Sequence, residues 1–139
     1  MTIAKKGVTI TKYGSINQIL GVVEPKISLP ITVAQSVGAT VDSKKIVKAG
    51  TPVFGDLTNR ETAFVAATQY KAASDNSGTE VPAKATGVIL HDVDVTGGDS
   101  EASILVFGVV NLSRIDTETQ KLLTVKVQEA MNGVFFIKD

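Results

Sequence analysis

The chain has 139 residues, of which 43% are hydrophobic and 20% charged, and its formal net charge is zero. This length favours a single domain, and the composition is that of a globular protein and excludes a disordered one. The absence of cysteine excludes disulfide bonds, thiolate metal sites and cysteine nucleophiles. No apolar run reaches the ~18 residues of a membrane span, and the N-terminus lacks a signal-peptide core. We therefore expect a soluble protein without a membrane partner.

The charges are spread unevenly along the chain. Residues 1–50 hold seven lysines and two acidic residues, whereas residues 51–112 hold three basic and eight acidic residues. Ordinary surface charge accounts for this pattern, and so does an N-terminal segment that docks on an acidic partner surface. Nucleic acid is not an expected partner, because the lysines are dispersed and no nucleic-acid-binding module is recognisable.

The first 24 residues contain short apolar pieces separated by Lys, Gly, Thr and Ser, without a long periodic pattern. Three interpretations stay open: a loosely attached terminus, an arm that orders only against a partner, and a core strand, for which residues 18–23 (QILGVV) are the candidate. We place an extended N-terminal arm at residues 1–24 and a single β-rich domain at residues 25–139. That domain is expected to fold without the arm.

Residues 25–57 predict short strands separated by turns. Apolar residues at period two are typical of a half-buried strand, and they are Ile27, Leu29, Ile31 and Val33. Pro30 lacks a backbone N–H, which predicts an edge strand or a break. Turn signals at residues 36–38, 49–50 and 55–56 bound a strand that begins at Ile46 and an extended piece that begins near Pro52.

Residues 58–73 are a helix candidate with a competing interpretation. Thr58 and Glu61 match a capping box, and apolar residues recur at helical spacing, namely Ala63, Phe64, Ala67 and Tyr70. Thr, Val and Tyr also suit extended chain, so a strand or irregular structure stays open. Residues 74–84 are polar, contain Gly78 and Pro82, and predict a loop.

The segment 87–112 has the strongest strand pattern. It reads GVILHDVDV, then the acidic loop TGGDSEAS, then ILVFGVVNL. The nearly unbroken apolar run from Ile104 to Val110 favours a strand that is buried on both faces. We expect its two strands to pair antiparallel and the rest of the chain to be organised around them.

The C-terminal segment predicts one helix and a last strand. Thr117 and Gln120 match a capping box, and Asp116 is a second candidate cap. Asn132-Gly133 is a helix stop, and residues 134–138 predict a strand. The helix is expected from an apolar stripe that comprises Leu122, Leu123, Val127, Ala130 and Met131. The predicted fold is mainly β, a compact β-sandwich or barrel-like domain with one short α-helix near the C-terminus.

Few residues are candidates for chemistry. The only histidine, His91, lies near Asp92, Asp94 and Asp99, which invites a metal, but in a strand Asp92 and Asp94 share the face opposite to His91. Solvated acidic side chains beside a buried strand are the simpler interpretation. The chain has no G-x-S-x-G elbow, and nothing selects a pair of catalytic carboxylates. We predict no catalytic residue, no cofactor, no metal and no enzyme activity.

Four strings carry a resemblance: KAGTP at 48–52, GDLTNR at 55–60, GVILHDVDV at 87–95 and FGVVNL at 107–112. Over about residues 44–139, the chain resembles the head decoration and head fibre proteins of tailed bacteriophages. The resemblance implies a small, mostly β, non-enzymatic protein on the outside of the icosahedral head. Such proteins commonly form trimers at threefold and quasi-threefold positions, where they cement capsid subunits or carry a fibre. Because this chain stops after the last predicted strand, decoration is favoured over a fibre.

On this resemblance we expect a virion protein on the capsid exterior, made in the host cytoplasm, whose partners are the major capsid protein and further copies of itself in a homotrimer. The alternative function is a head-displayed adhesion module that binds carbohydrate or the host cell surface. That function needs exposed aromatic rings, and the chain has no Trp and two Tyr. Capsid contacts are expected from the arm, through Lys5, Lys6, Lys12, Tyr13, Ile16 and Ile19.

Overall fold

The computed structural model describes residues 19–73 and 78–138, apart from the side chains of residues 22–25. Within these residues the chain is mainly β, with two short α-helices near the C-terminus, which confirms the predicted fold class. The strands are β1 (Leu20–Val33), β2 (Ala39–Val41), β3 (Lys44–Val47), β4 (Pro52–Phe54), β5 (Val65–Ala66), β6 (Gly87–Ile89), β7 (Val93–Asp94), β8 (Ser100–Asn111) and β9 (Val134–Ile137). The helices are α1 (Thr117–Gln120) and α2 (Val125–Ala130), with 3-10 turns η1 (Gln35–Val37) and η2 (Leu112–Arg114).

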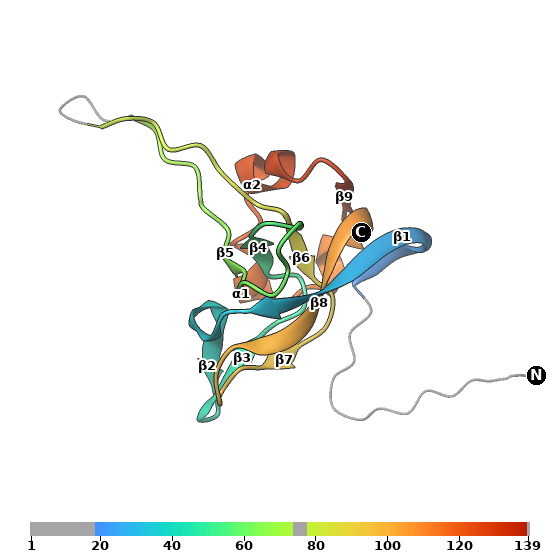
Figure 1. Ribbon diagram of the computed structural model, residues 1–139. Coiled ribbons are helices and arrows are strands. Elements are labelled where there is room, and N and C mark those ends of the chain that lie inside the picture. Colours follow the sequence, from blue (N-terminus) through green and yellow to red (C-terminus); the bar gives the residue numbers. More distant parts are fainter. Residues whose placement is uncertain (1–18, 74–77, 139) are drawn as a thin grey trace, which may run out of the picture.

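Strand β8 pairs with three strands of the larger sheet, namely β1, β6 and β9 (Figure 1). The sheet has the order β1-β8-β6-β4-β5, and β9 pairs with β8 in addition. The pairing of β6 with β8 is antiparallel, with Val88 opposite Leu105 and Ile89 opposite Ile104, as the sequence predicts. Strand β9 runs parallel to β8, and a second sheet has the order β2-β3-β7.

Two apolar cores lie on opposite faces of β8. Ile104 and Leu105 are neighbours in a strand, so their side chains point to opposite faces, and both are fully buried. Leu105 belongs to the first core, which includes Val127 of α2. Ile104 belongs to the second core, which includes Val47 of β3. The prediction that this strand is buried on both faces is therefore confirmed at its centre.

Strand β1 begins earlier than the predicted domain. Leu20 pairs with Val110, and the Asn111 N–H donates to the Ile19 carbonyl at 2.8 Å. Ile19 and Leu20 are both buried in the first core. The predicted boundary between residues 24 and 25 therefore falls inside a strand, and the folded body includes Ile19. Strand β1 is the outer member of its sheet, which confirms the edge position that Pro30 predicts.

The helix alternative for residues 58–73 is wrong, because this segment bonds to the edge of β1. The Thr32 N–H donates to the Arg60 carbonyl at 3.2 Å, and the Phe64 N–H donates to the Thr32 carbonyl at 2.8 Å. Thr58 donates from its N–H and its hydroxyl to Asp56 instead of capping a helix. Phe64 is the one fully buried side chain among described residues 58–73. The apolar residues at helical spacing therefore do not form a buried helix face.

Beyond β5 the chain forms a projecting ribbon, defined as residues 68–73 and 78–84. These two segments pair through bridges between Thr68 and Lys84 and between Lys71 and Val81. Figure 1 shows them side by side, extending away from the rest of the molecule. The ribbon is thus a two-stranded extension, where the sequence predicts a loop for residues 74–84.

The predicted C-terminal helix is divided in two. Asp116 accepts a hydrogen bond from the Glu118 N–H and caps α1, so the cap is Asp116 and not Thr117. Thr124 caps α2 by accepting from the Val127 N–H. Leu123 lies in the turn between the two helices, and its side chain packs in the first core. The predicted final strand is confirmed as β9.

Candidate functional site

The structure describes only one of the six predicted capsid-contacting residues. Lys5, Lys6, Lys12, Tyr13 and Ile16 lie outside the described residues. The sixth, Ile19, is 0% exposed and packs in the first core. Ile19 is therefore a core residue, and its side chain offers no surface to a partner.

Two of the strings that carry the resemblance meet at one place. The Ala49 N–H donates to Asp92 Oδ1 at 2.8 Å, and the Gly50 N–H donates to the Ile89 carbonyl at 2.6 Å. Gly50 has a φ of 94°, and a Cβ there would lie 2.8 Å from Ile115 Cδ1. Only glycine combines this left-handed conformation with so close an approach. These residues position a turn against the central strands, so the strings specify local structure.

The acidic residues near His91 bind backbone groups from different segments. Asp94 accepts from Thr96, and Asp99 accepts from the Gln35 N–H at 2.9 Å. Hydrogen bonds from the Thr96 hydroxyl and N–H lower the pKa of Asp94 below its ordinary value of 3.8. His91 and these aspartates are exposed. No three His, Asp or Glu residues in the described part of the chain are arranged to hold a metal ion.

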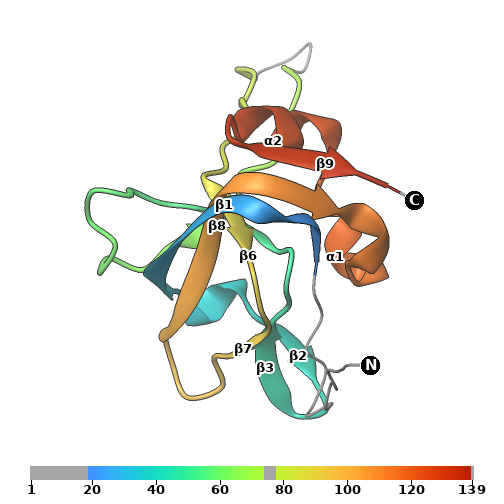
Figure 2. The ribbon, with the colours of Figure 1, turned by 90° about the vertical axis from the view of Figure 1, so that its right-hand side faces the viewer.

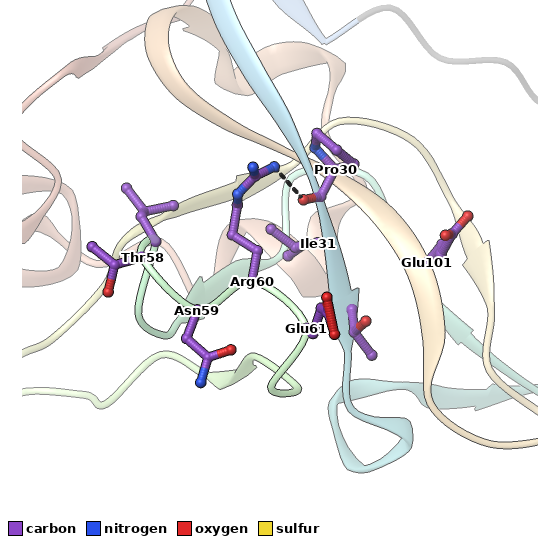
Figure 3. A pocket seen from close by; sticks show the side chains of 9 residues that line it. Pro30, Ile31, Thr58, Asn59, Arg60, Glu61 and Glu101 are labelled. Carbon is purple, nitrogen blue, oxygen red and sulfur yellow. Dashed lines mark hydrogen bonds between the residues drawn. The ribbon is translucent and has the colours of Figure 1, made fainter.

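A cavity of about 420 Å³ opens beside the edge of β1 (Figure 3). Arg60 crosses its wall and donates from Nη1 to the Pro30 carbonyl at 3.1 Å. Glu61 and Glu101 lie at its rim. The guanidinium therefore holds the turn at residues 57–61 to β1.

A second cavity of about 480 Å³ lies between the β2–β3 hairpin and α1. Its walls are more apolar, and Val41 and Leu122 line it while remaining partly exposed to solvent. An arrangement of this kind can accept an apolar side chain from a partner. Its other apolar lining residues are Val37, Ala39 and Ile46.

A further apolar surface lies on β1, β8 and β9, which run side by side in Figure 2. Ile27 pairs with Phe107, and Val109 pairs with Phe135. A Cβ on Gly21 would lie 2.6 Å from Ile137 Cδ1 and 3.3 Å from Val109 Cγ1, so these side chains share a face. We call this surface the outer apolar face, and its members are Ile27, Phe107, Val109, Phe135 and Ile137.

Sequence reasoning missed the outer apolar face, although β9 carries a signal for it. Residues 134–137 are all apolar, and in a strand their side chains must point alternately to two sides. Val134 is buried in the first core, whereas Phe135 is 57% exposed. This apolar run therefore predicts that the strand is either buried on both faces or buried on one face and apolar on the solvent-exposed face.

The base of the projecting ribbon is fixed to the helical segment. Gln69 donates to the Leu122 carbonyl at 2.9 Å and accepts from the Thr124 hydroxyl at 3.1 Å. The Tyr70 hydroxyl donates to Glu80 at 2.6 Å, which raises the pKa of Tyr70. Lys126 Nζ lies 5.1 Å from the centre of the Tyr70 ring. One side of this ring is therefore occupied by a cation from its own chain.

No protein-family model and no curated protein matches the chain. Within residues 19–73 and 78–138, no helix is long and apolar enough to cross a membrane.

Proposed function

We propose that this protein is a non-enzymatic structural protein of a phage virion. It binds the outside of the capsid as a homotrimer at threefold or quasi-threefold positions and stabilises the head. The resemblance of the sequence strings to head decoration proteins carries this proposal. It is supported by the contact of Ala49 and Gly50 with Asp92 and Ile89, through which two of these strings form one structural unit.

The surface of the described body suits adhesion. It combines the outer apolar face with an apolar cavity beside the β2–β3 hairpin. A decoration protein acts in many copies, and a trimer that touches several capsid subunits gains affinity from effective concentration even where each contact is weak. The partner is the major capsid protein. The segment before Ile19, with Lys5, Lys6 and Lys12, forms the charged part of the contact.

Binding to carbohydrate needs exposed aromatic rings, and the exposed rings of Phe107 and Phe135 belong to the outer apolar face. Tyr13 lies outside the described residues, and the ring of Tyr70 is covered on one side by Lys126. A sugar that stacks on Tyr70 would have to displace this lysine or use the other ring face. A glycan array is the direct measurement of this alternative.

Co-sedimentation of the purified full chain with mature phage heads that lack it tests the proposed function. We expect saturable binding with a copy number that matches the threefold and quasi-threefold sites. A chain without residues 1–18 is expected to stay folded and to lose most of this binding. The capsid function is contradicted if the folded full chain does not sediment with heads. The role of the arm is contradicted if the shortened chain binds as well as the full chain.

A further inference from the structure

Strand β8 is apolar on both faces, but the described residues cover one of these faces along only half of its length. Near Ile104, the second core covers the face opposite to Leu105. Pairing with β1 then shifts register, because Ser28 pairs with Leu105 and Ile27 with Phe107. The extra residue, Val106, is a β-bulge that reverses the alternation of side chains.

Beyond this bulge the two faces of β8 are unequal. Val110 and Val134 are buried in the first core. Phe107 and Phe135 point to the opposite side, where they are 39% and 57% exposed. Ile27 and Ile137 on the flanking strands are 52% and 44% exposed. Among residues 19–73 and 78–138, no second layer covers this apolar face of the sheet.

The size and chemistry of the outer apolar face match the centre of a protein interface. Its four most exposed side chains leave roughly 300 to 500 Å² of apolar area open, taking about 150 to 250 Å² for each large apolar side chain when fully exposed. A stable interface buries about 800 Å² per partner, with aromatic residues enriched in its centre. The face would thus supply the apolar half of such an interface.

The outer apolar face is compatible with a second copy of this chain as its occupant. In a symmetric assembly the same residues of different copies meet around one axis, so a charged patch would bring like charges together. None of the five side chains of the outer apolar face is titratable. We propose that copies of this chain associate with one another through the outer apolar face, with these faces gathered around a common symmetry axis.

The inference rests on the self-association that the proposed function includes, and a charge-exchange experiment tests it. Sedimentation velocity on the full chain is expected to show an oligomer for the wild type. Phe135→Glu and Phe135→Lys are each expected to weaken association more than tenfold and to sediment as single chains. Their equimolar mixture is expected to recover part of the association, because mixed oligomers place opposite charges beside each other.

Val125→Glu is the matched control, because Val125 is 66% exposed at the start of α2 and is not a member of the outer apolar face. It is expected to sediment like the wild type, and circular dichroism checks that every variant is folded. A wild type that sediments as single chains overturns the inference. So do Phe135 variants that keep the wild-type oligomer, or a mixture that stays dissociated.

Head co-sedimentation separates this inference from the proposed function. A single-chain wild type that still binds heads overturns the inference and leaves capsid binding in place. A wild type that forms the oligomer through this face but does not bind heads overturns the capsid function and supports the inference.

Discussion

At the residue scale, Asp92 joins two segments that are distant in sequence. Its carboxylate accepts from the N–H of Ala49, a residue that is almost completely buried. In Asp92→Ala this N–H loses its acceptor, and we expect the free energy of unfolding to fall by about 1 to 3 kcal/mol. Asp92→Asn is expected to lose less, because an amide oxygen can still accept. Urea denaturation near neutral pH measures both changes.

Glu118→Ala is the control for removal of an exposed carboxylate. Glu118 forms an ion pair with Lys121 at 2.9 Å, and both side chains are largely exposed. Such pairs contribute about 0 to 1 kcal/mol. If Asp92→Ala costs no more than Glu118→Ala, the bond to Ala49 does not hold the turn in place.

The hydrogen bonds of Asp94 predict a dependence of stability on pH. Thr96 lowers the pKa of Asp94 below 3.8 in the folded protein, first through its hydroxyl and then through its N–H. This contribution is fully present above the unfolded pKa and is lost as the pH falls through the lower folded value. We expect stability to decrease below about pH 4 more steeply in the wild type than in Asp94→Asn. Denaturation series from neutral to strongly acidic pH measure the slopes, and parallel curves would contradict this role.

At the scale of elements, the start of β1 sets where the chain can be shortened. A chain without residues 1–18 keeps Ile19 and Leu20, whereas a chain without residues 1–24 loses both buried side chains. Losing a buried Ile or Leu side chain costs about 2 to 5 kcal/mol. We expect the first truncation to keep the melting temperature of the full chain and the second to unfold at a much lower temperature. Equal melting temperatures would show that β1 does not need its first residues.

Most strands were predictable because their patterns are local. Alternation in residues 27–33 and the apolar run from Ile104 to Val110 each match a strand in the structure. Residues 58–73 were not predictable in this way, because hydrogen bonds to β1 decide their conformation. The break between α1 and α2 depends on which side chains the first core can accept, and that is also a tertiary property.

At the scale of the whole molecule, the candidate surfaces could be predicted only in part. The exposed acidic side chains around His91 follow from composition. They do not follow from strand alternation, because the predicted strand 87–95 is divided into β6 and β7 and His91 and Asp92 lie between them. The outer apolar face follows from neither, because it depends on a one-residue bulge at Val106 and on how far each core extends. Five of the predicted contact residues, from Lys5 to Ile16, lie outside the described residues. Their contact with the capsid stays a prediction, which the head-binding experiment tests.

The pairing of β1 with β8 also has a consequence during synthesis. The partners are separated by roughly 70 to 90 residues of chain, which a ribosome adds in about 4 to 18 s. Throughout this interval β1 lacks its partner β8, although its alternating apolar residues favour aggregation. Pro30 and Lys26 interrupt that pattern, and residues of these types discourage pairing with other nascent chains. The proline that marks an edge in the finished sheet thus protects the strand before the sheet exists.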